Sequence, residues 1–182
     1  MPERFPSTFG TAIGVALTST AMWLAMGWAV TPLVIALIGS YLLWLSRDRW
    51  PIGRAIGVAY GTAIAVQCVH LLEEYRTGFY RVFPTVFGAE PWEAGRFLVF
   101  NAAWLVVFLM GAIGLTAKRR PAVLIALFLA VGGGLGNGIG HVALALRAGG
   151  YFPGTHTAPL ALVTGGTLLA LLLRPTTRVD DA

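Results

Sequence analysis

The chain has 182 residues, of which 57% are hydrophobic and only 12% are charged, and its net charge is +5. A soluble domain carries about 25% charged residues, so this composition excludes an ordinary soluble protein and indicates a membrane protein. The basic residues lie in short clusters between apolar runs, which is typical of membrane-topology signals and not of a nucleic-acid-binding surface. The single cysteine, Cys68, excludes a disulfide framework within the chain.

The apolar runs predict an all-α, polytopic transmembrane bundle of about six helices, forming one integral membrane domain over residues 1–182. Each run approaches the length of about 20 residues that crosses a bilayer as a helix. The predicted helices span residues 8–30, 32–46, 53–75, 92–117, 121–148 and 157–173. Residues 76–91, which are rich in aromatic side chains, are predicted to be the one long loop.

The distribution of Lys and Arg predicts the orientation in the membrane. With six spans, both termini lie at the same face. The opposite face then carries only Arg76, Arg81, Arg96 and Arg147 of the 13 basic residues, and the terminal face carries the rest. Because positive charge accumulates on the cytoplasmic side, both termini are expected to be cytoplasmic.

One stretch of the third predicted helix places ionisable side chains at membrane depth, where they are rare and usually functional. It reads His70-Leu71-Leu72-Glu73-Glu74. Residues three and four apart share a helix face, so Glu73 and Glu74 can both lie beside His70. Gln67 is three residues before His70 and lies on the same side. The alternative is an interfacial cap in which the two carboxylates face headgroup water.

Other polar residues fall at the same depth in other helices. In alternating spans, Asn101 of the fourth predicted helix and Asn137 and His141 of the fifth lie in the outer half of the membrane, as His70 does. Asn137 and His141 are four residues apart and share a face. We expect His70, Glu73 or Glu74, Asn137 and His141 to converge on one pocket, with Asn101 and Tyr151 around it.

The fifth predicted helix also carries glycines spaced by four, Gly132, Gly136 and Gly140. Such a stripe of small residues lets a second helix or a ligand approach the backbone closely. We expect Gly136 and Gly140 to face a neighbouring helix at close range. The alternative for this helix is a small-residue packing seam with a buried Asn–His hydrogen bond.

This ordered set of residues resembles the HXXEE-domain family of small bacterial integral membrane proteins. The resemblance covers about residues 60–170 and rests on His70, Glu73, Glu74, Asn101, Asn137, His141 and the turn Tyr151-Phe152-Pro153-Gly154. In that turn, Phe152 stands where the family pattern leads us to expect Ser. The resemblance implies the inner membrane of a bacterium, but the family is named for a motif and not for an activity.

We therefore expect an intramembrane enzyme that acts on an apolar, lipid- or isoprenoid-like small molecule reached from the bilayer. Imidazoles and carboxylates on facing helices are suitable ligands for Zn or Fe. The histidines are too few for the di-iron site of membrane desaturases. The expected metal ligands are His70, Glu73, Glu74 and His141, of which His70, Glu73 and Glu74 are also the expected catalytic residues. The expected substrate-binding or supporting residues are Gln67, Asn101, Asn137 and Tyr151.

Two other functions fit the same residues. A metal-free isomerase or cyclase would use the Glu pair and a histidine as acid and base, because adjacent carboxylates resist double ionisation and share a proton. A proton- or ion-coupled carrier would use them as a relay. Six helices are few for a carrier, so a homo-oligomer would have to supply the path. The expected partners are the lipid bilayer and an apolar small molecule, and not nucleic acid.

Overall fold

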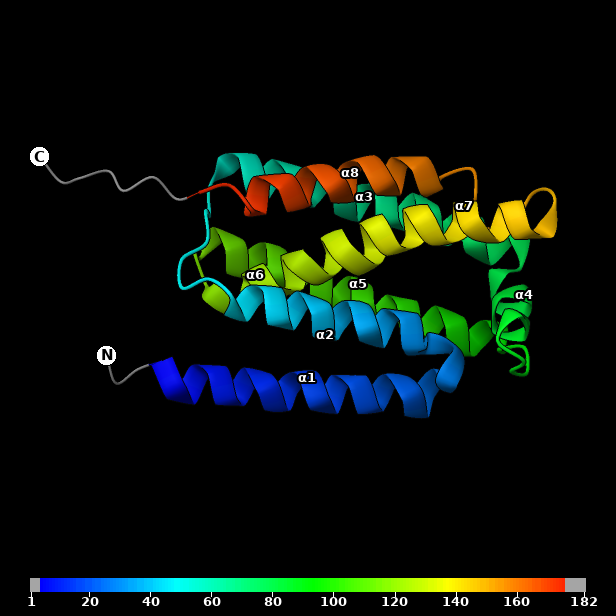
Figure 1. The fold of residues 1–182 in the computed structure, drawn as a ribbon, viewed down its shortest axis with the longest axis horizontal. Coiled ribbons are helices and arrows are strands. Elements are labelled where there is room, and N and C mark those ends of the chain that lie inside the picture. Colours follow the sequence, from blue (N-terminus) through cyan, green and yellow to red (C-terminus); the bar gives the residue numbers. More distant parts are fainter. Residues whose placement is uncertain (1–3, 176–182) are drawn as a thin grey trace, which may run out of the picture.

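Every regular element that the computed structural model describes is helical (Figure 1). The description covers residues 4–175, with side chains from residue 8 onwards. The elements are α1 (Arg4–Met26), the 3-10 turn η1 (Trp28–Val30), α2 (Thr31–Leu45), α3 (Arg54–Thr77), α4 (Phe79–Val86), α5 (Ala94–Thr116), α6 (Arg120–Phe128), the π-helix η2 (Leu129–Gly136), α7 (Asn137–Ala148) and α8 (Ala158–Leu172).

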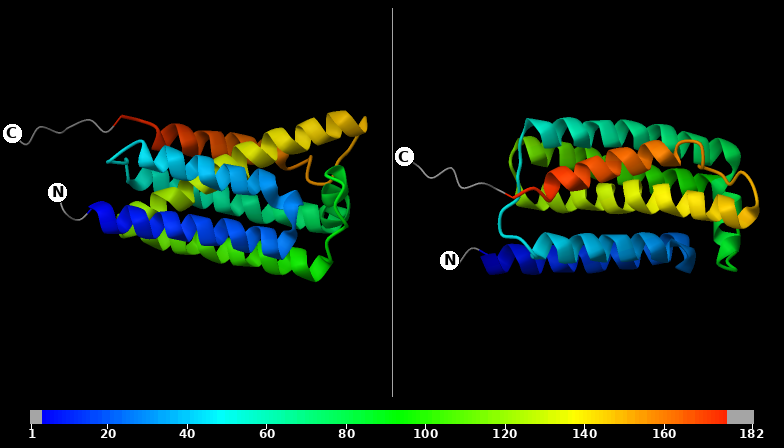
Figure 2. Two further views of the ribbon diagram at one scale, coloured as in Figure 1. Left: turned by 60° about the horizontal axis from the view of Figure 1, so that its bottom comes forward. Right: turned by 45° about the horizontal axis from the view of Figure 1, so that its top comes forward.

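The length and composition of these helices define an integral membrane protein. Of the described stretches, five are long and apolar enough to cross a membrane, and the last of them is the continuous run of α6, η2 and α7. The 15-residue α8 is apolar but shorter. α8 packs against α3 and against the stretch formed by η2 and α7 (Figure 2), and its opposite face, with Leu160 and Val163, is exposed. The predicted helical bundle is thus confirmed.

The predicted long loop is partly wrong, because residues 79–86 form the helix α4. This helix crosses one end of the bundle beyond α3 and α5 (Figure 1). It is amphipathic: Phe79 and Tyr80 are buried, whereas Arg81 and Val82 are exposed. Eight residues are too few to show a clear helical period in the sequence, and Pro84 within the helix obscures it further. The aromatic side chains therefore cap the bundle instead of lying in a loop.

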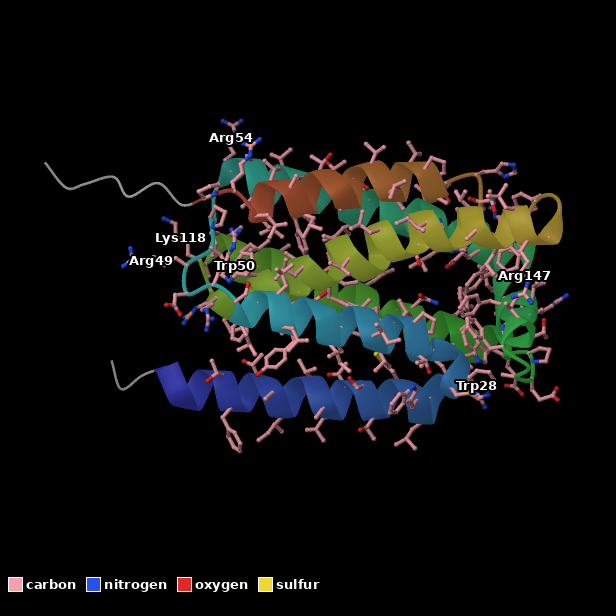
Figure 3. All side chains as sticks on the ribbon, in the orientation of Figure 1. Trp28, Arg49, Trp50, Arg54, Lys118 and Arg147 are labelled. Atoms are coloured by element: carbon pink, nitrogen blue, oxygen red, sulfur yellow. The ribbon has the colours of Figure 1, made fainter. Side chains whose placement is uncertain are left out.

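The two ends of the bundle carry different numbers of basic side chains. Arg49, Arg54 and Lys118 lie at the end where α1 begins and α8 finishes, whereas Arg147 lies at the opposite end (Figure 3). The start of α1 and the end of α8 thus lie at the end of the bundle that carries Arg49, Arg54 and Lys118.

Hydrogen bonds from arginines join the helices at the more basic end. The Arg47 Nη1 donates to the carbonyl of Leu173, at 2.8 Å, just after α8 finishes. The Arg120 guanidinium lies 3.9 Å from the ring centroid of Trp44 and donates to the carbonyl of Arg47. These contacts use otherwise unpaired carbonyls near helix ends and connect α2, α6 and α8.

The closest helix contact of the fifth span is made by a different set of glycines from the one we predicted. A Cβ added to Gly134 would lie 2.5 Å from the Cα of Gly165 on α8, and one added to Gly138 would lie 2.5 Å from Leu162 Cβ. By contrast, a Cβ on Gly140 would meet nothing within 4 Å, and one on Gly136 would meet only its own helix. The prediction for Gly136 and Gly140 is therefore wrong, because the face that they share borders a cavity and not a neighbouring helix.

Candidate metal centre

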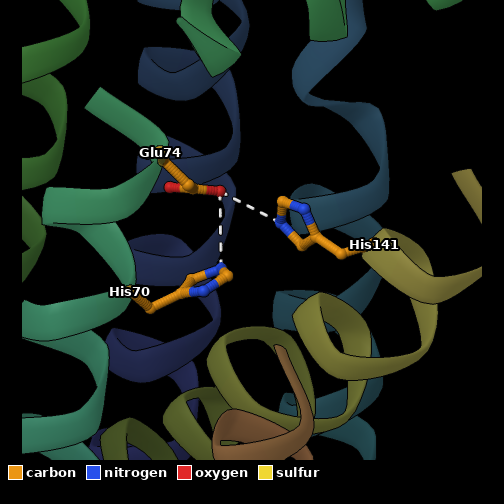
Figure 4. A group of neighbouring side chains, drawn as sticks. All are labelled: His70, Glu74 and His141. Carbon is orange, nitrogen blue, oxygen red and sulfur yellow. Dashed lines mark ion pairs between the residues drawn. The ribbon is translucent and has the colours of Figure 1, made fainter. Parts of the chain in front are cut away.

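Two histidines and one carboxylate converge at the end of the bundle covered by α4 (Figure 4). His70 and Glu74 are four residues apart on α3 and so share a face, and His141 faces them from α7. Glu74 Oε1 lies 3.5 Å from His70 Nε2 and 3.1 Å from His141 Nε2. All three residues are buried, with exposed fractions of 4% or less. The predicted convergence of His70, Glu74 and His141 is thus present.

The hydrogen bonds of the two rings fix which nitrogen of each carries the proton. His141 Nδ1 lies 2.7 Å from the carbonyl oxygen of Pro153, which can only accept, so Nδ1 carries the hydrogen. His70 Nδ1 lies 2.7 Å from Thr157 Oγ1, whose own hydrogen is donated to Glu73. His70 Nδ1 must therefore donate as well. When the rings are neutral, both Nε2 atoms present a lone pair to Glu74.

Three lone-pair atoms thus face one another in a buried space, which is unfavourable unless protons or a metal ion lie between them. A single proton can join His141 Nε2 to Glu74 Oε1. It leaves the buried His70 Nε2 without a hydrogen-bond partner, and this atom has none in the described structure. Leaving a buried polar atom unpaired costs about 1–3 kcal/mol. A metal ion accepts all three lone pairs at once.

The distances of the two histidine nitrogens from Glu74 Oε1 suit a metal ion. Zn²⁺ binds His nitrogen and carboxylate oxygen at about 2.0–2.2 Å, so neighbouring ligands of a tetrahedral site lie roughly 3.3 Å apart. The two distances to Glu74 Oε1 are 3.5 and 3.1 Å. Each imidazole also donates its other N–H to an oxygen, as metal-binding histidines usually do. Two histidines and one carboxylate are ligands of both catalytic zinc and non-haem iron.

Glu73, which we expected to be a ligand, lies outside this group. Its carboxylate accepts hydrogen bonds from the backbone N–H groups of His156 (3.0 Å) and Thr157 (2.8 Å), and from the hydroxyls of Thr157 and Tyr151. Adjacent helical residues point to different faces, so Glu73 turns toward the start of α8 while Glu74 turns inward. The carboxylates therefore do not form the proton-sharing pair that the acid–base alternative used.

Tyr151 supports Glu73 and does not reach the metal centre. Its hydroxyl donates to Glu73 Oε1 at 2.7 Å, and its ring stacks on His156 at the surface. Burial raises the pKa of the Tyr151 phenol, and the adjacent Glu73 carboxylate raises it further. The phenol thus stays protonated and keeps its hydrogen bond to Glu73.

An apolar cavity of about 360 Å³ adjoins the metal centre, with Glu74 and His141 in its wall. Its lining is otherwise dominated by aromatic and aliphatic side chains, among them Phe79, Phe83, Phe87, Trp92, Phe97, Phe100, Trp104, Phe108 and Phe128. Gln67, Asn101 and Asn137 also line it, so the predicted convergence of these residues on one pocket is present.

Two contacts of the site, made by Thr157 and by the carbonyl of Pro153, were not predicted from the sequence. Thr157 accepts the hydrogen bond of His70 and donates its own hydrogen to Glu73. Pro153 holds His141 through its backbone carbonyl. Every residue has such a carbonyl, so the contact cannot be recognised from the sequence. Thr157 stands directly before α8, where Thr is a common capping residue, and that position was the available signal. In the structure Glu73 takes the place of the cap, because it accepts the N–H of Thr157.

The fold and these side chains define a helical membrane protein with a buried His–Glu–His group. A family model described as "Protein of unknown function with HXXEE motif" matches residues 61–169, more than half of the chain, and the chain belongs to this family. Its motif corresponds to His70-Leu71-Leu72-Glu73-Glu74, and the matched segment contains His70, Glu74 and His141. Neither a curated protein nor a solved structure matches the chain.

Proposed function

We propose that this protein is a metal-dependent intramembrane enzyme that acts on an apolar, lipid-like substrate. One observation carries the proposal: two histidines, each with its Nδ1 hydrogen committed elsewhere, present Nε2 to the same oxygen of Glu74. The metal is Zn²⁺ or Fe²⁺, and His70, Glu74 and His141 are its ligands. Glu73, Thr157 and Pro153 orient these ligands.

A catalytic role is supported by the number of protein ligands and by their surroundings. Structural zinc sites are closed by four protein ligands, whereas catalytic sites use three and leave a position for water or substrate. Only three candidate ligands converge in the described structure, and two of them, Glu74 and His141, line the cavity. The open position therefore faces the space in which a substrate would lie.

The wall of the cavity supports an apolar substrate that enters from the bilayer. Pro32 on α2 and Gly136 and Ala143 on the opposite wall line the cavity and are also exposed, so the cavity opens sideways between α2 and the fifth span. These two elements diverge toward the end that carries the metal centre (Figure 1). A cavity of this size lies within the usual range for small-molecule sites, about 300–1,000 Å³.

The metal-free acid–base enzyme is the second candidate, and one contact favours it. His141 Nε2 and Glu74 Oε1 are close enough, at 3.1 Å, to share a proton. This pair would replace the Glu73–Glu74 pair as the acid and base.

A carrier would need a continuous polar path. Apart from Glu74, His141, Gln67, Asn101 and Asn137, the lining of the cavity is apolar.

Metal analysis of the purified protein tests the proposal. The protein is purified in detergent, dialysed against a metal-free buffer and assayed for Zn and Fe by mass spectrometry. We expect about one ion per chain, and loss of that ion in His70→Ala, His141→Ala and Glu74→Ala. His156→Ala is the matched control, because His156 is exposed and lies outside the group of three.

The same samples decide between the two candidates. If wild-type protein holds no more metal than His141→Ala, even after zinc or iron is supplied during purification, the metal proposal is wrong. The shared proton of His141 and Glu74 is then the remaining basis for acid–base chemistry. Circular dichroism of each variant confirms that a lost ion does not reflect a lost fold.

A further inference from the structure

Three amide side chains lie in the cavity wall deeper in the bundle than the metal centre. Gln67 precedes Glu74 by seven residues on one face of α3, and Asn137 precedes His141 by four on one face of α7. At 1.5 Å per residue, they lie about 6–10 Å below the metal-binding residues. Asn101 extends from α5 into the same cavity.

Most of the polar atoms of these amides lack the hydrogen-bond partners that polar groups at membrane depth normally have. Gln67 is only 7% exposed, yet among the described residues neither its amide nor that of Asn137 has a hydrogen-bond partner. Asn101 Nδ2 donates to the carbonyl of Phe97 in its own helix, at 2.9 Å, and its side-chain oxygen accepts nothing. Unpaired amides at membrane depth are unfavourable, so their presence points to a ligand.

The charge of the cavity restricts the chemistry of that ligand. No Lys or Arg is among the side chains that line the described cavity, and its carboxylate and imidazole lie at the metal end. A phosphate or diphosphate beside the amides would find no cationic partner, and such groups are normally bound by Arg or Lys. Amides can both donate to and accept from an uncharged oxygen.

We infer that the cavity binds an uncharged amphiphile, whose hydroxyl or carbonyl oxygen contacts Gln67 and Asn137 while its apolar body lies against the aromatic wall. This inference rests on the proposed function, because the metal centre marks the reacting end of the same cavity. It narrows the substrate class to neutral lipids such as long-chain alcohols, ketones or esters, and it excludes phosphate-bearing lipids at the amides.

Photolabelling with a defined probe tests this inference. A long-chain alcohol bearing a diazirine is crosslinked to the protein in nanodiscs, and the unlabelled alcohol, the alkane of equal length and the alkyl phosphate compete with it. We expect the alcohol to compete roughly tenfold better than the alkane or the phosphate. Gln67→Met and Asn137→Leu should remove this preference, whereas Thr62→Val on the exposed face of α3 should retain it.

Metal content is measured on the same samples, so the two proposals fail separately. The inference is overturned if the phosphate competes as well as the alcohol, or if Gln67→Met and Asn137→Leu both keep the preference for the alcohol. Loss of the preference with full metal content supports the amide contacts. If the wild-type protein holds no metal but still prefers the alcohol, the metal proposal is wrong and the amide site remains.

Discussion

Gly154 lies against the imidazole ring of His141, so closely that no side chain fits between them. A Cβ on Gly154 would lie 2.6 Å from His141 Nδ1, and the residue has a φ of +92°. The neighbouring carbonyl of Pro153 accepts the hydrogen bond of the same nitrogen. The turn before α8 thus holds His141 both by contact and by hydrogen bonding, and this explains why a Pro-Gly turn adjoins the His–Glu–His group.

Gly154→Ala should therefore disturb the metal centre although the side chain is not a ligand. The added methyl group must displace His141 or the turn, and the positive φ costs a further 1–3 kcal/mol or so. We expect weaker metal binding and a lower melting temperature, measured by isothermal titration and thermal unfolding in detergent. Gly150→Ala is the matched control, because its Cβ would meet nothing within 4 Å. Equal effects of the two substitutions would contradict the contact.

Thr157→Ala should weaken metal binding while leaving the three ligands in place. The hydroxyl orients His70 and passes its hydrogen bond to Glu73. Loss of such a supporting partner typically lowers metal affinity by about 10–100-fold. Thr157→Ser keeps the hydroxyl and should restore most of the affinity, whereas Thr157→Val, which keeps the shape, should not. Indistinguishable affinities for Ser and Val would show that the hydroxyl has no such role.

Glu73→Gln and Glu74→Gln should differ, although the residues are neighbours in the motif. Glu73 holds the turn before α8 through four hydrogen bonds, so its substitution should lower the free energy of unfolding by about 1.5–3 kcal/mol and retain the metal. Glu74→Gln should lose the metal with a smaller effect on stability. Thermal unfolding and metal analysis of both variants measure the difference. Metal loss in Glu73→Gln with an intact fold would mean that Glu73 is a ligand after all.

Gly134→Ala and Gly140→Ala should differ in stability, although both lie in the same glycine-rich helix. The Gly134 methyl group would meet the backbone of Gly165, and overpacking of this kind costs about 1–3 kcal/mol. The Gly140 methyl group meets nothing within 4 Å, so that variant should be as stable as the wild type. Thermal unfolding compares the two. A destabilised Gly140→Ala would show that α7 packs more closely than the structure indicates.

Cysteine labelling tests the orientation that the basic residues predict. In a Cys68→Ser background, a cysteine at exposed Glu90, between α4 and α5, should react with an impermeant reagent added to intact cells. A cysteine at Lys118, at the opposite end of the bundle, should react only after the membrane is permeabilised. The reverse pattern would place the metal centre near the cytoplasmic face.

The sequence predicts the bundle and most of the polar residues around the cavity, for reasons that are local. Long apolar runs identify the membrane helices, and a spacing of three or four places His70 beside Glu74. The alternating direction of the spans brings His141 to the same depth. None of these arguments depends on how the helices pack.

What the sequence did not predict depends on packing and on backbone groups. Both Glu73 and Glu74 are suitably spaced from His70, and only the position of α8 decides that Glu73 binds the turn before it. The carbonyl of Pro153 carries no residue signature. Gly136 and Gly140 share a face as expected, but only the packing of the helices decides that this face lines the cavity while Gly134 and Gly138 contact α8.

The π-helix has a consequence for how the chain tolerates insertions and deletions. A wider turn of this kind accommodates one more residue than an α-helix over the same length, and such turns often lie at functional sites. Each residue of an α-helix turns the chain by about 100°, so closing Leu129–Gly136 into α-helix without shortening it would swing Asn137 and His141 away from α3. Deleting one residue from Leu129–Gly136 would let this segment form a regular α-helix while the side chains of Asn137 and His141 keep their direction. The extra residue sets the angular register between the half of the span that packs on α2 and the half that faces the cavity.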